Sequence, residues 1–167
     1  VIRDILVLKD TVLSYDTIDH ANLLDALWTE MFPDIRRSTP GLISNEWCAD
    51  FGFQNSNPSS DFRGMGIFGL HQLEYFARTF PVEARALLMQ CQNPSIDKYI
   101  PFAATGINMT AFVVQLMRER RLHGHIFRTL SENVLSTNST QCAINTVHGV
   151  YCKLYISFGV LWAKERV

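Results

Sequence analysis

The chain has no excess of charge of either sign, and this limits the partners that its overall field could attract. Its 15 lysines and arginines balance 16 aspartates and glutamates, for a formal net charge of −1. Such a balance produces no summed field towards polyphosphate backbones or anionic lipid. We therefore expect no general binding of nucleic acid.

Metal-binding patterns are also missing. Five histidines are present, but none belongs to an H-E-x-x-H motif. The cysteines lie far apart, without a C-x-x-C pair or the spacing of a metal finger, at Cys48, Cys91, Cys142 and Cys152. We expect reduced thiols, as in a cytoplasmic protein, and neither a metal nor a cofactor.

Apolar runs of membrane-spanning length are missing too. The longest, residues 150–163, contains Lys153 and is shorter than the about 20 residues that a spanning helix needs. No signal peptide is visible, and because the chain opens at Val1 without a methionine we expect it to be part of a longer protein. The expected location is the cytoplasm.

Strand patterns are the last notable absence. The sequence contains no alternation of polar and apolar residues long enough for a sheet, and no internal repeat. Apolar residues instead recur at intervals of three and four almost throughout, which is typical of helices with one buried face. The 167 residues, 47% of them hydrophobic, are enough to bury about two-thirds of the surface in one core. We predict an all-α fold, a single compact multi-helix domain over residues 1–167.

Prolines, glycines and capping residues divide this pattern into helices. Pro33 ends one helix, Pro81 opens another, and Ser44 caps a short helix that Gly52 closes. Further along, the arginines at 118–121 and Gly124 end a helix that begins near residue 102. The predicted segments lie near 2–13, 23–31, 45–51, 70–80, 81–91, 102–116, 126–130 and 144–161, and their core-facing residues include Phe112 and Leu161.

A polar segment at residues 52–66 carries a lone arginine among closely spaced glycines. Gly64, Gly66 and Gly69 fit G-x-G-x-x-G, which binds dinucleotides when it follows a buried strand and opens a helix. No strand pattern precedes it here. We therefore interpret the glycines as positions for tight turns with positive φ.

Arg63, in the same segment, has two interpretations. It could form a structural ion pair with Asp50 or Asp61, as surface arginines commonly do. Alternatively, the flanking glycines let the backbone approach a partner, and the segment presents the guanidinium to an anion. Spacing alone favours the ion pair. Full burial of Arg63 would support the ion pair, whereas exposure on a surface cleft would support presentation to a partner.

An ordered string of residues runs through this segment and beyond it. It comprises Trp47, Gly52-Phe53-Gln54, Pro58, Asp61-Phe62-Arg63-Gly64, Gly66, Gly69-Leu70, Leu73, Tyr75-Phe76, Tyr99, Pro101-Phe102 and Asn108-Met109-Thr110, and it extends towards Trp162. On these residues the chain resembles the ELMO domain family, and specifically its small ELMOD type. The match covers roughly residues 23–165 and leaves out 1–16. Ser60 stands where the family usually has threonine.

The resemblance implies an activity and a site. Proteins of the ELMOD type are GTPase-activating proteins for small GTPases of the Arf and Arl families, and the arginine of their D-F-R-G string is regarded as essential. That arginine is Arg63 here. The resemblance implies that Arg63 acts on GTP bound to a partner, that the chain has no catalytic centre of its own, and that the loop is positioned, or the partner contacted, by Gln54, Asp61, Gly64 and Gly66. The glycines would let the loop enter a nucleotide cleft, and Asp61 would hold Arg63 ready.

One alternative stays open. ELMO proteins proper are scaffolds that pair with Dock-family exchange factors acting on Rac, and they lack this arginine. A domain of that kind would be a catalytically silent module that docks a small GTPase or a Dock-type exchange factor. Because the arginine is present, the activator is the favoured hypothesis. Under both hypotheses any membrane association would be peripheral and run through the partner, and the oligomeric state is left open.

Overall fold

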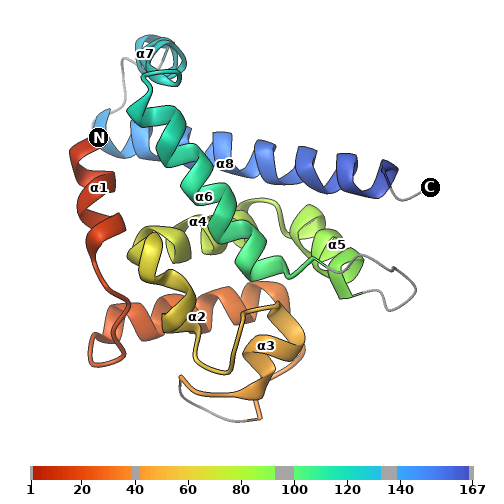
Figure 1. Cartoon of the computed structure of the whole chain (residues 1–167). Helices are drawn as coiled ribbons and strands as arrows, with labels where there is room; N and C mark the ends of the chain where they lie inside the picture. Colours follow the sequence, from red (N-terminus) through yellow and green to blue (C-terminus); the bar gives the residue numbers. More distant parts are fainter. Residues whose placement is uncertain (1, 39–41, 93–99, 133–138, 166–167) are drawn as a thin grey trace.

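The computed structural model describes residues 2–38, 42–92, 100–132 and 139–165 (Figure 1). Every regular element within these ranges is a helix, which confirms the all-α prediction. In chain order they are α1 (Ile2–Asp10), α2 (Ile18–Met31), α3 (Asn45–Phe51), the 3₁₀ helix η1 (Pro58–Gly64), α4 (Gly66–Thr79), α5 (Pro81–Gln92), α6 (Phe102–Arg118), α7 (His123–Glu132) and α8 (Ser139–Lys164).

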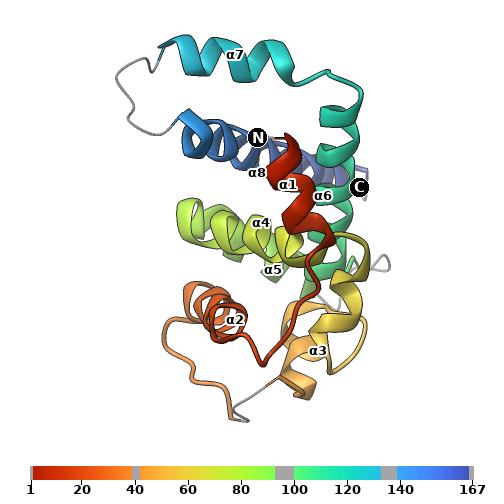
Figure 2. The ribbon, with the colours of Figure 1, turned by 90° about the vertical axis from the view of Figure 1, so that its left-hand side faces the viewer.

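Helix α4 forms the centre of the domain. It packs against α1, α2, α5, α6, α8 and η1, and Figure 2 shows it between α2 on one side and α8 on the other. Four residues of its predicted apolar stripe, Leu70, Leu73, Phe76 and Ala77, are fully buried, whereas the fifth, Phe80, follows the helix and is partly buried. Helix α7 lies outermost, beyond α8 (Figure 2). The domain is therefore built around α4, and η1 rests directly on this central helix.

The helix boundaries are confirmed where a local signal predicts them. Pro33 follows the end of α2, and Pro81 opens α5. Ser44 Oγ accepts a hydrogen bond from Glu46 N at 3.2 Å and so caps α3. Gly52 ends α3 in the left-handed conformation, with φ of +74°. These ends depend on local backbone chemistry, which the sequence displays directly.

Two apolar side chains that were expected to face the core are exposed instead: Phe112 by 45% and Leu161 by 60%. Successive helical residues are rotated by about 100°, so only one of two neighbours can point fully at the same core. Beside Phe112 it is Val113 that is fully buried. Beside Leu161 it is Trp162 that is partly buried against the core.

Gly124 does not end a helix, contrary to the prediction. α6 already ends at Arg118, and Gly124 lies in the first turn of α7 with open space around it. The arginine-rich turn alone therefore separates the two helices. Tyr99 of the ELMO string lies outside the described residues.

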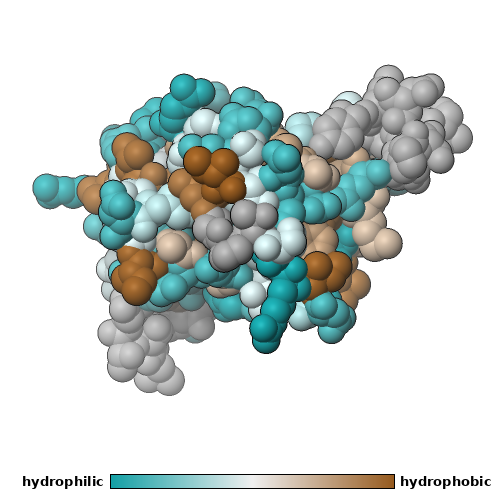
Figure 3. Space-filling model, turned by 90° about the horizontal axis from the view of Figure 1, so that it is seen from below, coloured by the Kyte–Doolittle hydropathy of each residue, from teal (hydrophilic) through white to brown (hydrophobic). Residues whose placement is uncertain are grey.

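The surface offers no membrane-spanning feature in the described ranges, because no helix there is both long and apolar enough. Seen from below, the face formed around α2 and α3 is mostly hydrophilic, with apolar side chains that stand apart from one another (Figure 3). Scattered apolar side chains are normal on a protein surface and indicate no particular partner.

Candidate functional site

The segment around Arg63 is a short 3₁₀ helix, η1, where the sequence suggested only a polar loop. Pro58 begins it, with a fixed φ that suits a first helical turn. Just before it, Asn57 Oδ1 accepts hydrogen bonds from Ser59 N at 3.1 Å and from Ser59 Oγ at 2.7 Å. Ser60 Oγ donates to Asn57 O at 2.9 Å. Short polar side chains thus hold the backbone of η1 in place.

Aromatic residues beneath η1 fix its position on the domain. Phe62 is 1% exposed, and its ring centroid lies 5.7 Å from that of Phe53, which lies 5.8 Å from that of Trp47. Gly69 leaves room for Phe62, since a Cβ on it would lie 3.0 Å from the ring. All three aromatic residues belong to the buried core. Phe62 therefore anchors η1, while the next residue, Arg63, is exposed.

Gly66 braces η1 against α1. Of the three glycines in the G-x-G-x-x-G pattern only Gly66 has a positive φ, at +52°. A Cβ on it would lie 2.5 Å from Thr11 O and 2.7 Å from Leu8 O, and the next residue, Ile67, donates its N–H to Thr11 O at 2.9 Å. Gly66 therefore approaches the backbone of Leu8 and Thr11 in the same chain, where the sequence suggested an approach to a partner. Gly64, by contrast, is exposed, and a Cβ there would meet nothing within 4 Å.

The guanidinium of Arg63 is held by one nitrogen only. Nε donates to Ser60 O at 2.8 Å. Among the described residues no carboxylate forms an ion pair with Arg63, and none accepts a hydrogen bond from its two terminal nitrogens. The ion pair expected with Asp50 or Asp61 is therefore absent. The exposure expected under the second interpretation is observed.

Asp61 has other partners. Its carboxylate accepts a hydrogen bond from Gln54 N at 2.8 Å and another from Ser60 Oγ at 3.1 Å. Asp61 thus ties η1 to the preceding segment and does not hold Arg63. Gln54 takes part through its backbone, and its side chain is exposed. At Asp50, burial and then the nearby Glu46 raise the pKa of the carboxyl, the direction expected without a cationic neighbour.

Arg63 lines a surface pocket of about 170 Å³ between η1 and the end of α1. Lys9, Asp10, Thr11 and Ser59 share the pocket, and Lys9 Nζ is paired with Asp10 Oδ1 at 2.7 Å. A cleft beside residues 52–66 was predicted, but its second wall was not, because α1 lies outside the ELMO string. No local pattern links two segments so far apart in the sequence.

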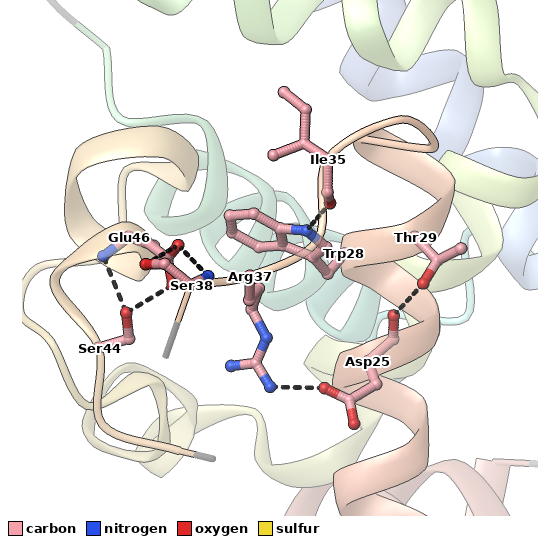
Figure 4. A network of polar contacts seen from close by, with 8 residues as sticks. All are labelled: Asp25, Trp28, Thr29, Ile35, Arg37, Ser38, Ser44 and Glu46. Atoms are coloured by element: carbon pink, nitrogen blue, oxygen red, sulfur yellow. Dashed lines mark hydrogen bonds and ion pairs between the residues drawn. The ribbon is translucent and has the colours of Figure 1, made fainter. Parts of the chain in front are cut away.

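Arg37 is an arginine whose side chain stabilises the fold, and it can be compared with Arg63 (Figure 4). Its Nη2 donates to Asp25 Oδ1 at 2.6 Å. Its guanidinium carbon lies 4.7 Å from the centroid of the Trp47 ring. The side chain is only 11% exposed. Arg37 therefore connects α2 to α3 through an ion pair and a cation–π contact. Arg63 has neither kind of contact within the described part of the chain.

Other features of the described residues offer less chemistry. No three histidine, cysteine, aspartate or glutamate side chains among them lie together as a metal ion would require. A second hollow, of about 420 Å³, lies between α5 and α8 and has a mainly apolar lining. It contains no residue of the ELMO string. The Arg63 pocket is therefore the candidate site.

The fold and the site together define a class: an all-helical domain that presents an exposed guanidinium on a braced 3₁₀ turn. The model of the ELMO/CED-12 family matches residues 3–167. The chain belongs to the ELMO/CED-12 family.

Similar proteins carry the ELMO domain in their names. ELMO domain-containing protein B of Dictyostelium discoideum is 38% identical over 160 residues, 95% of this chain and 50% of that protein. ELMO domain-containing protein 2 of Homo sapiens is 32% identical over 151 residues, 90% of this chain and 47% of that protein. The chain thus spans about half the length of these relatives. No solved structure matches it.

Proposed function

We propose that this domain activates GTP hydrolysis on a small GTPase of the Arf or Arl family, and that Arg63 supplies a cation to the partner's active site. The supporting observation is the guanidinium geometry: Nε is bonded to Ser60 O, while the terminal nitrogens have no partner among the residues that the structure describes. Membership of the ELMO/CED-12 family supports the choice of a small GTPase as the partner.

The chemistry requires little more than such a cation. In GTP hydrolysis negative charge spreads over the transferring phosphoryl group and the leaving oxygen, while the GTPase itself supplies Mg²⁺ and a residue that orients water. An arginine supplied by another protein raises the rate by about 10³–10⁵-fold. Its planar fork matches phosphate oxygens in a way that a lysine ammonium does not. The domain then needs no nucleotide site of its own.

The surroundings of Arg63 limit the freedom that would be lost on binding. Phe62 is buried, Gly66 lies against α1, and Asp61 is bonded to Gln54 N. A side chain on such a braced turn loses less conformational entropy when it enters a cleft than one on a loose loop. Gln54, Asp61 and Gly66 are thus positioning residues, and Gly64 leaves open space beside the guanidinium.

The test is a single-turnover hydrolysis assay on a panel of GTP-loaded Arf and Arl proteins. Addition of the chain should accelerate hydrolysis on at least one of them. Arg63→Lys should reduce that acceleration by about 10³-fold or more, with the affinity for the GTP-bound partner nearly unchanged. Arg37→Lys is the matched control and should keep the acceleration. Binding without acceleration by the unmodified chain would identify a silent docking module instead.

The proposal also has a consequence for location. The domain would work on the cytoplasmic side of endomembranes, wherever its GTPase partner is held.

A further inference from the structure

The turn between α6 and α7 concentrates positive charge at one end of the molecule. Arg118, Arg120, Arg121 and Arg128 are all exposed, and we call them, together with Phe127, the arginine corner. In Figures 1 and 2 the end of α6 leads into α7 at the edge of the domain opposite α2 and α3. None of these residues takes part in the Arg63 site.

The backbone of this corner is strained at an arginine. Arg120 N donates to Met117 O at 3.0 Å and Arg121 N to Leu116 O at 2.9 Å, the pair of bonds that ends a helix in a Schellman motif. The motif needs a left-handed residue, usually glycine, and Arg120 has φ of +60°. It is the only non-glycine residue with positive φ in the described part of the chain. A strained position occupied by a long cationic side chain points to a function for that side chain.

Helix α7 adds an apolar group to the same edge. Its exposed positions, Gly124, Phe127, Arg128, Ser131 and Glu132, follow the spacing of one helix face, while Ile126 is partly buried against the core. Phe127 is 67% exposed. The outer face of α7 therefore places an aromatic ring and a guanidinium next to each other. No hollow described above is lined by these residues.

The local charge differs from that of the rest of the chain. Residues 118–132 contain four arginines and two glutamates, a formal charge of +2, which leaves −3 for the remainder of a chain with a total of −1. Glu119 is engaged by Gln115 Nε2 at 2.7 Å and lies 3.9 Å from Arg121 Nη1. The balanced total charge thus hides a basic stretch of the sequence, and its four arginines are exposed in the fold.

We propose that the arginine corner is a docking surface for an anionic phospholipid bilayer. The arginines would meet lipid phosphates, and Phe127 would enter the interface between headgroups and acyl chains. Because these residues line none of the described hollows, the corner offers an extended acidic peptide no groove to bind in, and it suits a bilayer surface better. A few basic residues and one aromatic ring give weak, reversible attachment, which suits orientation of the domain rather than permanent anchoring. The proposal does not depend on the function assigned to Arg63.

The test measures binding to sedimented vesicles of phosphatidylcholine with or without phosphatidylserine. The chain should bind the vesicles that contain phosphatidylserine and not the neutral ones, and binding should weaken as salt is raised. Arg120→Gly should reduce the affinity about fivefold, and Phe127→Ser should reduce it as well. Arg36→Ala removes an exposed arginine from the segment after α2 and should leave binding unchanged, as should Arg63→Lys.

Arg120→Gly also separates a functional role from a structural one. Glycine suits the left-handed position better, so the denaturant midpoint of this variant should stay equal or rise while lipid binding falls. A lowered midpoint would assign Arg120 to the fold and overturn its role in docking. Equal binding to neutral and anionic vesicles would overturn the proposal, and so would binding of soluble polyglutamate but not of vesicles, which would indicate an acidic protein partner.

Discussion

Arg37 lies on the segment after α2 and Arg63 lies on η1, and their surroundings differ. Arg37 is nearly buried, paired with Asp25 and placed over the ring of Trp47. Arg63 is exposed and donates only Nε, to Ser60 O, within the described structure. The guanidinium of Arg37 makes a hydrogen bond and a stacking contact inside the protein. The two terminal nitrogens of Arg63 form no hydrogen bond or ion pair with the described residues and so can bind a partner.

The bracing around the two arginines also differs. Arg37 itself forms one of the contacts between α2 and α3, so its removal would weaken that connection. Around Arg63 the bracing is done by other residues, namely Phe62, Gly66 and Asp61. A guanidinium that the fold does not need, on a turn that the fold holds firmly, is the arrangement expected of a side chain that acts on a partner.

We expect the largest change in the free energy of unfolding from a substitution at Gly66, which packs against the end of α1 beneath Arg63. Gly66→Val forces a β-branched residue into φ of +52° and against Thr11 O and Leu8 O. We expect the free energy of unfolding to fall by about 3–5 kcal/mol, because the backbone penalty and the clash add. Denaturant titration measures this fall, and Gly66→Ala serves if the valine variant does not fold.

Gly64→Ala is the control for that experiment. Its φ is not positive and a Cβ there meets open space, so we expect a change within about 0.5 kcal/mol. Equal losses at the two glycines would show that Gly66 does not brace the turn against α1.

The next effect concerns pH and comes from a buried histidine of α8. Burial, then His71 and then Arg78 lower the pKa of His148 to about 4. The unfolded chain takes up this proton near pH 6.5, so stability should be complete above about pH 6.5 and fall towards pH 4, by about 3 kcal/mol in all. The measurement is the denaturant midpoint between pH 7 and pH 4.

His148→Gln should flatten most of that dependence, whereas His125→Gln on α7 should leave it intact. His71 adds a smaller slope of the same sign, since burial lowers its pKa as well. If the denaturant midpoint of His148→Gln fell with pH as steeply as that of the unmodified chain, the acid sensitivity would belong to another titratable group.

The smallest effect should distinguish the two arginines by stability alone. Arg37→Lys loses the planar contact with Trp47 and the bond to Asp25, so we expect a loss of about 1 kcal/mol. Arg63→Lys should change stability by less than about 0.5 kcal/mol, because the side chain is exposed. Losses of equal size at both positions would remove the contrast from which the function is argued.

The sequence was a good guide wherever the cause was local. Pro33, Pro81, Ser44 and Gly52 end or begin helices through their own backbone chemistry, and the structure follows them. The stripe of α4 was equally readable, because a central helix must bury a continuous face. On other helices the same spacing misled: Phe112 on α6 and Leu161 on α8 are exposed.

The site could be predicted only in part. Arg63 was found through the D-F-R-G string, and its exposure was expected. The contact of Gly66 with α1 and the bond from Gln54 N to Asp61 were not expected, because each joins segments whose proximity depends on the fold. Lys9 and Thr11 share the pocket of Arg63 for the same reason. Arg120 in the left-handed region has no sequence signal, since glycine is the usual residue there.

The central claim is that Arg63 acts on the transition state, and it is tested most directly by two affinities. The partner GTPase is loaded either with a non-hydrolysable GTP analogue or with GDP and aluminium fluoride, which imitates the transferring phosphoryl group. Arg63→Lys should leave the first affinity within about twofold and weaken the second by about 10²-fold or more. Equal losses in both states, or no loss in either, would contradict the claim.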